Sequence, residues 1–119
     1  MISIEDFKKV DIVVGQILTA EKILDTDKLL KLSVNLGPAL ELAGREEKRD
    51  IRQIISGIAT YFPDCSVLVG KKCMFIANLE PRTIRGIESQ GMILAVSDEA
   101  GGFSLLTLSN EIPAGARAK

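Results

Sequence analysis

The chain has 119 residues and a mass of 12.9 kDa, the size of one domain (1–119) that can bury a core of its own. Its apolar fraction of 46% is that of an ordinary globular protein, and no apolar run approaches the roughly 20 residues that cross a bilayer. The net charge of −1 argues against whole-surface affinity for nucleic acid, so any such binding must be local. The acidic start "MISIEDFKKV" lacks the pattern of a signal peptide, so we expect a cytoplasmic protein with no membrane partner.

The residue types present also bear on catalysis. Histidine is absent, which removes the commonest general base and the imidazole ligands of zinc or iron sites. Cys65 and Cys73 stand eight positions apart, which indicates neither a C-x-x-C motif nor a disulfide framework. The stretch "AGGFS" (100–104) lacks the following helix of a dinucleotide site and fits a hairpin turn. We therefore predict no catalytic residue, no metal site and no cofactor, and expect a protein that is not an enzyme.

In chain order, the first predicted element is a short helix over 3–10. Ser3 is its N-cap, and Asp6 stands three positions later in a capping-box arrangement. Gly15 interrupts a β-branched run and suggests a bulge or a sharp bend. In the next strand Lys31 falls on the polar face and its leucine neighbours on the core face, a period of two. Six strands are predicted in all, over 10–18, 29–36, 50–59, 71–79, 91–98 and 102–109.

Two further segments complete the predicted fold. The charged stretch 41–50 forms the turn of a hairpin and is either a solvated loop or a partner-binding arm. A second short helix is expected over 63–71, with Pro63 in its first turn and Gly70 at its end. The prediction is therefore all-β: an OB-fold five-stranded barrel with a short N-terminal helix, a short helix between strands 3 and 4, and a C-terminal β extension. Such barrels bind oligonucleotides through strand faces and loops.

The polar loop "NLEPRTIRGIESQGM" (78–92) lies between two apolar runs. With "DFKKVDIVVGQI", "KLLKLSVNLG" and "IISGIA", it resembles the tRNA-binding domain of stand-alone bacterial tRNA-binding proteins, of methionyl-tRNA synthetase C-termini and of cytokine-like synthetase cofactors. The resemblance runs from Phe7 to about Gly115 and is greatest to the methionyl-tRNA synthetase version. It implies an OB-fold, non-catalytic binding of tRNA by shape, and a homodimer formed partly through C-terminal strands. A synthetase catalytic domain, in cis or in trans, is a further implied partner.

In that family the loop usually reads N-x-K-P-R-K-x-R-G-x-x-S-x-G-M. This chain departs from the pattern at Glu80 and Thr83, and it has Val13 where the family often has arginine. Phosphate neutralisation supplies most non-specific affinity, so we expect weaker tRNA binding than in more basic relatives. The chain keeps the remaining positions, which are Asn78, Pro81, Arg82, Arg85, Gly86, Ser89, Gly91 and Met92.

The retained side chains suit RNA. Arg82 and Arg85 can fork onto phosphates or stack on bases. Asn78 and Ser89 offer neutral donors and acceptors to 2′-hydroxyls and base edges. Met92 either presents a polarizable surface to a flipped base or begins a buried strand. With the best basic candidate outside the loop added, the predicted tRNA-binding residues are Lys31, Asn78, Arg82, Arg85, Ser89 and Met92.

Aromatic residues are few, which favours a shape-reading tRNA binder over a sequence-specific reader of single strands. Tyr61 and Phe62 either stack on bases or cap the barrel. The run "GFSLLTLS" (102–109) is apolar on both faces, which predicts a symmetric dimer that covers one of them. The alternative function is that of a polypeptide-binding export chaperone, since a related group of such chaperones shares this fold; it would require an apolar surface groove.

Overall fold

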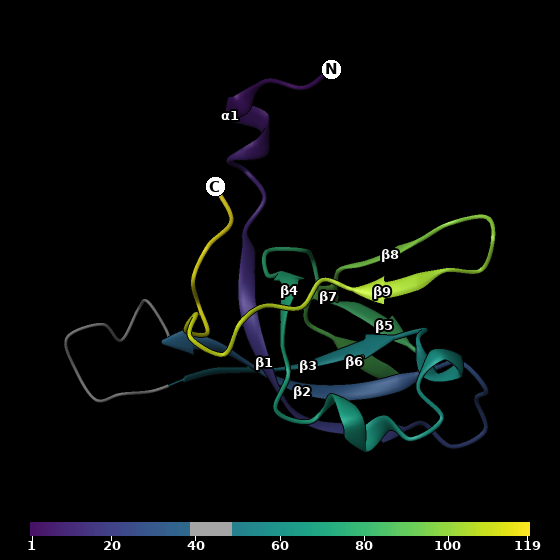
Figure 1. Ribbon diagram of the computed structural model, residues 1–119. Helices are drawn as coiled ribbons and strands as arrows, with labels where there is room; N and C mark the ends of the chain where they lie inside the picture. The colour runs from purple at the N-terminus through teal and green to yellow at the C-terminus, as the bar shows by residue number, and fades with distance from the viewer. Residues whose placement is uncertain (39–48) are drawn as a thin grey trace.

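The computed structural model describes residues 1–38 and 49–119. Its centre is one antiparallel five-stranded sheet, curled on itself, with the strand order β3-β2-β1-β4-β7 (Figure 1). The predicted OB-like, all-β fold is confirmed. Most of the charged stretch predicted as a hairpin turn, 41–48, lies outside the described residues. The strands of the sheet are β1 (Ile12–Lys22), β2 (Leu30–Pro38), β3 (Arg49–Ser56), β4 (Lys72–Ile76) and β7 (Met92–Ile93).

Smaller elements surround this sheet. Helix α1 (Ile4–Phe7) stands clear of it and has the predicted capping box between Ser3 and Asp6 (Figure 1). Two 3₁₀ helices, η2 (Ala59–Tyr61) and η3 (Cys65–Leu68), lie between β3 and β4. Two hairpins are attached: β5 (Arg82–Ile84) with β6 (Ile87–Ser89), and β8 (Ala95–Ser97) with β9 (Phe103–Leu105). None of the helices among the described residues is long and apolar enough to span a membrane.

The alternation predicted for β2 places Leu30, Leu32 and Val34 fully inside the core, where they pack with Phe75 of β4. Gly15 lies opposite this cluster. A Cβ at Gly15 would come within 2.6 Å of Phe75 Cδ1, so a side chain there would clash with the core. The expected bulge is found elsewhere, because the register of β1 and β2 shifts between Ile17 and Thr19. Gly15 serves close packing instead.

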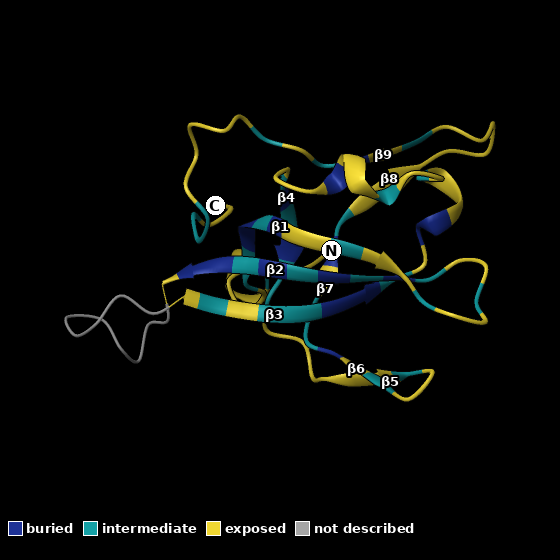
Figure 2. Ribbon diagram, turned by 90° about the horizontal axis from the view of Figure 1, so that it is seen from below, coloured by how far each residue is buried: buried dark blue, intermediate teal, exposed yellow. Residues whose placement is uncertain are grey.

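Other boundaries also differ from the predictions. The helix expected over 63–71 is the single 3₁₀ turn η3, capped by Asp64, whose carboxylate accepts from the Ser66 amide. The strand expected over 91–98 is divided into β7 and β8. The loop 78–92 contains a hairpin of its own, β5–β6, which lies beyond the edge of β3 (Figure 2). These differences leave the predicted OB-like, all-β fold intact.

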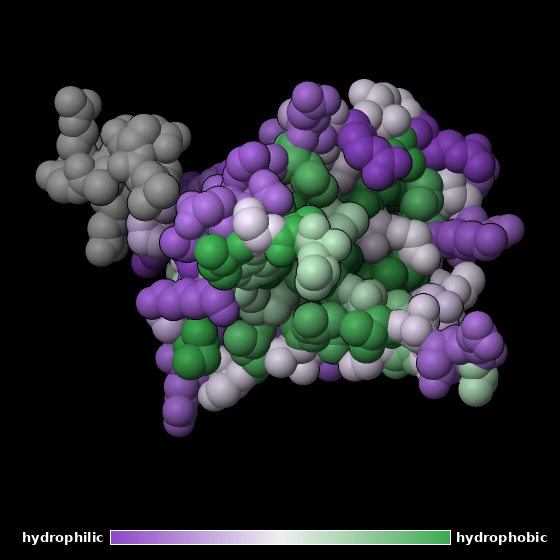
Figure 3. All heavy atoms as spheres, turned by 90° about the horizontal axis from the view of Figure 1, so that it is seen from above, coloured by the Kyte–Doolittle hydropathy of each residue, from purple (hydrophilic) through white to green (hydrophobic). Residues whose placement is uncertain are grey.

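The end of the chain returns to the barrel. Residues 115–118 run antiparallel beside the first half of β1, where Val14 exchanges 2.8 Å hydrogen bonds with Gly115 and Ala116. Seen from the side of α1, the surface has a broad apolar area bordered by hydrophilic side chains (Figure 3). The N-terminal residues Met1, Ile2 and Ile4 are exposed. The apolar side chains at the N-terminus are therefore not used in the core of a single chain.

Candidate nucleic-acid interface

The turn of the β5–β6 hairpin consists of Arg85 and Gly86. Their φ values of 54° and 79° place both residues in the left-handed region, as a two-residue type I′ turn requires. Glycine and asparagine are favoured there, whereas a longer side chain costs about 1 kcal/mol. Arg85 is nevertheless exposed, and so is Arg82 at the start of β5. Neither arginine has an ion-pair partner among the described residues.

Strand pairing brings Lys31 and Arg82 into one lateral row. Lys31 of β2 pairs with Ile55 of β3. The Ile55 amide donates to Ser89 Oγ of β6 at 2.9 Å, and Ser89 pairs with Arg82 of β5. Two cations that are 51 positions apart in the sequence are thus separated by only two strands. On the far side of this row, Lys31 Nζ lies 3.8 Å from a carboxylate oxygen of Glu21 on β1.

Two of the predicted RNA-binding side chains, those of Ser89 and Asn78, form hydrogen bonds within the fold. Ser89 is only 4% exposed, and its hydroxyl also donates to the Gly91 carbonyl at 3.1 Å. Asn78 accepts from the Asp11 amide at 2.8 Å and donates to the Lys9 carbonyl at 2.6 Å. The hydrogen bonds of Ser89 fix the loop to β3. Those of Asn78 fix the segment after α1 to the start of the loop. Both side chains position the hairpin.

Met92 is 40% exposed at the start of β7, so it is not the core residue that one of its two interpretations required. Of the three positions where the chain departs from the family pattern, Glu80 and Thr83 are exposed near or in β5. Val13 is 7% exposed and belongs to the core. The departure at Val13 therefore replaces an expected charge by a packed apolar side chain.

A polar seam closes the barrel between β3 and residues 88–91, and no motif in the sequence predicted it. The Gln53 side chain donates to the Glu88 carbonyl at 2.8 Å, while the Gln53 amide donates to Gln90 Oε1 at 3.0 Å. Arg52 forms two bonds to Asp50, at 3.1 and 2.9 Å, and donates to the Ala77 and Gln90 carbonyls. No pattern in the sequence distinguishes these strand residues from solvated ones.

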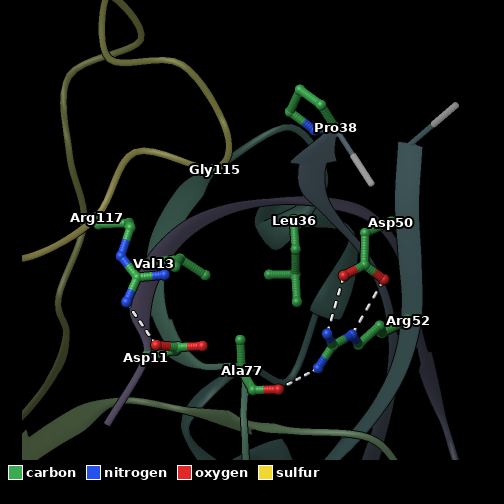
Figure 4. A pocket seen from close by; sticks show the side chains of 9 residues that line it. All are labelled: Asp11, Val13, Leu36, Pro38, Asp50, Arg52, Ala77, Gly115 and Arg117. Carbon is green, nitrogen blue, oxygen red and sulfur yellow. Dashed lines mark hydrogen bonds and ion pairs between the residues drawn. The ribbon is translucent and has the colours of Figure 1, made fainter. Parts of the chain in front are cut away.

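Next to the seam, a pocket of about 240 Å³ opens at one end of the barrel (Figure 4). Arg52 and Asp50 stand on one side, Arg117 and Asp11 on the other, and Leu36 lies between them. Each arginine is ion-paired with the aspartate beside it. Each positive charge of the pocket is matched by a neighbouring negative charge. A phosphate would therefore be attracted less strongly to this pocket than to the unpaired arginines of the hairpin.

Within the described part of the chain, no group of three or more His, Cys, Asp or Glu side chains could hold a metal ion. Both cysteines are free, and burial raises the pKa of the Cys73 thiol, which disfavours a reactive thiolate there. The arrangement is that of a β-barrel binding module with two exposed arginines on its β5–β6 hairpin, neither of them ion-paired within the described residues.

Comparison with known proteins agrees with this class. Residues 12–117 match the family model described as "Putative tRNA binding domain", and the chain belongs to this tRNA-binding domain family. It is 39% identical over its full length to a methionine–tRNA ligase of Deinococcus radiodurans, and 43% identical over 99% of its length to that of Methanocaldococcus jannaschii. The chain spans about a sixth (16%) of the length of each of these relatives.

A solved structure of similar length is the MetRS related protein of Pyrococcus horikoshii. It is 36% identical, with a TM-score of 0.85 over 100% of this chain and 98% of that one. The chaperone CsaA of Bacillus anthracis has the same fold, with a TM-score of 0.79 at 24% identity and coverage of 100% and 99%.

Proposed function

We propose that this chain is a non-catalytic module that binds tRNA by shape and backbone charge. The observation that carries the proposal is Arg85, an exposed arginine held in a left-handed turn position where glycine or asparagine is favoured. The position costs energy, and no hydrogen bond or ion pair of the Arg85 side chain among the described residues offsets that cost. A guanidinium kept there, beside a second unpaired arginine, suits an external anion such as a phosphate. Membership of the tRNA-binding domain family supports tRNA as the source of that anion.

In this proposal the six predicted residues have two roles. Arg82, Arg85 and Lys31 contact phosphate or base, with Lys31 exchanging its Glu21 partner for RNA at little cost, because exposed ion pairs contribute about 1 kcal/mol or less. Met92 presents its exposed side chain to a base. Asn78 and Ser89 contribute through the hydrogen bonds that fix the loop, which leaves their side chains few free donors for RNA.

The relatives support a proposal for the biological setting of the chain. We propose a cytoplasmic protein that is either a domain of a methionyl-tRNA synthetase or a stand-alone homologue acting with one, supported by the identity to methionine–tRNA ligases. Tethering such a module to a catalytic body raises the local concentration of tRNA. The chemistry of aminoacylation would then belong to the synthetase body and not to this domain.

We also propose a homodimer. Met1, Ile2 and Ile4 are exposed, and Leu106 and Leu108 of the C-terminal run are only partly buried. A symmetric contact that covers both sets would remove them from water and join two RNA-binding surfaces. Sedimentation velocity at high micromolar concentration tests this, and a monomer there would contradict it.

A polypeptide-binding function is the second candidate. The fold is shared with the chaperone CsaA, and the exposed apolar residues at the N-terminus would suit an unfolded segment. This second candidate does not use Arg82 or Arg85, whose positions are the main support for tRNA.

One paired titration separates the two candidates. Labelled tRNA transcript and a labelled unfolded polypeptide are each titrated with the chain at 50 and 200 mM salt, with fluorescence anisotropy as the readout. tRNA binding should weaken as salt rises, with a shallow slope because few cations are available. Binding of the polypeptide alone, unchanged by salt, would favour the chaperone-like function and overturn the proposal.

A further inference from the structure

A second surface, away from the arginine hairpin, combines an aromatic ring with a cation. Tyr61 of η2 stacks on Phe103 of β9 with ring centroids 3.9 Å apart and an interplanar angle of 5°. Phe62 packs edge-on against the same Phe103 ring, at 6.0 Å and 74°. Phe62 and Phe103 are partly buried against the core, so Tyr61 forms the outer layer of an anchored stack.

Tyr61 remains 49% exposed despite this stacking. One face of its ring is covered by Phe103, which leaves the opposite face as the accessible one. Two roles are compatible with Tyr61 and Phe62 in the sequence, stacking on bases or capping the barrel. Phe62 packs against the core and so caps the barrel. Tyr61 is more exposed than a side chain that only caps the barrel would be. A rigid ring with one free face is the usual platform for a nucleobase.

The surrounding pocket has a volume of about 450 Å³, within the range of small-molecule sites. Among the described residues, Lys71 is the only charged one that lines the pocket; it is exposed and has no ion-pair partner there. Ser104 and Thr107 add hydroxyls to the same lining. The nearby Asp98 is already used, because its carboxylate accepts from the Ala100 and Gly102 amides of the β8–β9 turn. A cationic ligand would be repelled by Lys71, whereas an aromatic base followed by a phosphate fits both the ring and the charge.

We propose that this pocket is a second RNA subsite, in which one unpaired base stacks on the free face of Tyr61 and its phosphate lies near Lys71. The inference rests on the proposed tRNA-binding function and adds to it a contact that does not involve the hairpin. It also predicts that the module prefers RNA with an unpaired nucleotide over a fully paired duplex of equal length.

The composition makes the test direct, because Tyr61 is the single tyrosine of the chain. Protein labelled with 3-fluorotyrosine gives one ¹⁹F resonance, which is unaffected by RNA absorbance. Titration with tRNA transcript should shift this resonance saturably, with the same Kd as anisotropy of labelled tRNA. Tyr61→Leu should weaken tRNA binding about tenfold, since a stacked base contributes about 1 to 3 kcal/mol. Tyr61→Phe, which keeps the ring, should bind as the parent does.

Val67→Ala is the matched control, since Val67 is 50% exposed on the neighbouring η3 and does not line the pocket. It should leave the affinity unchanged, and Lys71→Gln should lower the salt slope by about one. If tRNA binds while the resonance stays in place and Tyr61→Leu binds normally, the subsite is wrong and the tRNA-binding function stands. A resonance that moves with unfolded polypeptide but not with tRNA would assign the pocket to peptide instead. Absence of tRNA binding by both methods would overturn the proposed function itself, and the subsite with it.

Discussion

Along the edge of β3 the polar side chains are turned toward backbone groups. Ser89 and Gln90 bond to β3 from one side, and Arg52 and Gln53 bond to residues 77 and 88–90 from the other. In the β5–β6 hairpin, a few residues away in the same loop, Arg85 is exposed and has no ion-pair partner among the described residues. The seam holds the barrel closed, and the hairpin stands outside it (Figure 2).

The contrast between Arg52 and Arg85 teaches that residue type alone does not mark a binding site. Both are arginines that directly follow an isoleucine in the sequence. Arg52 satisfies an aspartate and two carbonyls, so transferring it to a phosphate would leave those groups unpaired. Arg85 gives up no hydrogen bond within the described residues on meeting a phosphate, and its turn position already carries a conformational cost. An uncommitted side chain at a costly position is the stronger indication of function.

The largest effect is expected at the seam. Arg52→Met keeps the aliphatic volume but leaves Asp50 and the Ala77 and Gln90 carbonyls without their donor. We expect the free energy of unfolding to fall by about 2 to 3 kcal/mol, since hydrogen bonds to charged groups contribute about 1.5 to 3 kcal/mol. Urea denaturation measures it. Arg82→Met is the matched control, because an exposed arginine should change stability by less than about 0.5 kcal/mol. Equal stability of the two variants would remove the distinction between seam and hairpin.

Ser89→Ala tests the same seam with a smaller change. The buried Ile55 amide and the Gly91 carbonyl each lose a partner. Stability should fall by about 1 to 2 kcal/mol, because an unsatisfied buried donor keeps its desolvation cost. Thermal melts measure the loss, with the exposed Ser97→Ala as the control. The folded fraction should lose little tRNA affinity, because Gln53 and Gln90 still bond the loop to β3. A loss as large as that expected for Arg85→Asn, in a fully folded variant, would contradict a purely positioning role for Ser89.

The seam is also where sequence reasoning was least informative. The barrel strands could be predicted because their apolar residues alternate, as Leu30, Lys31 and Leu32 do. Closure depends on side-chain to backbone bonds between β3 and residues about 35 positions later, such as the Ser89 bond to Ile55, and no local period encodes such bonds. The β5–β6 hairpin was missed for a related reason. Its turn contains Arg85–Gly86 instead of the Asn–Gly that normally signals a two-residue turn.

For the candidate site, the sequence located the loop but did not separate contact residues from supporting ones. Asn78 and Ser89 carry the same donor and acceptor atoms whether they bind RNA or the backbone, so only coordinates distinguish the two roles. Exposure also had to come from the structure, since Met92 had equally plausible buried and exposed interpretations. Lys31 was assigned to the polar face of its strand by periodicity alone, and the structure places it in one row with Arg82.

At the hairpin, Arg85→Asn should separate binding from folding. Asparagine tolerates the left-handed region, so the turn is kept and stability should stay within about 0.5 kcal/mol of the parent or rise slightly. tRNA affinity should fall about tenfold, because one charged donor to phosphate or base is lost. Anisotropy with labelled tRNA measures the affinity and urea denaturation the stability. Arg85→Lys keeps the charge and serves as the control, with an intermediate loss if the fork geometry of arginine matters. An asparagine variant that unfolds would make Arg85 a structural residue, like Arg52.

The smallest effect is expected from restoring a basic residue beside the hairpin. Glu80 is exposed, precedes β5 and carries a negative charge close in sequence to Arg82. Glu80→Lys removes a charge that repels phosphate and adds one that attracts it. The slope of log affinity against log salt should therefore steepen by about one or slightly more, with a modest gain in affinity at low salt. Fold and stability should not change, because the position is on the surface. Glu5→Lys, an equal charge change on the exposed helix α1, is the control for net charge. If both substitutions steepen the slope equally, the gain comes from overall charge and the hairpin is not a localised site. A response confined to Glu80 would place the RNA backbone next to β5, on the outer side of the seam.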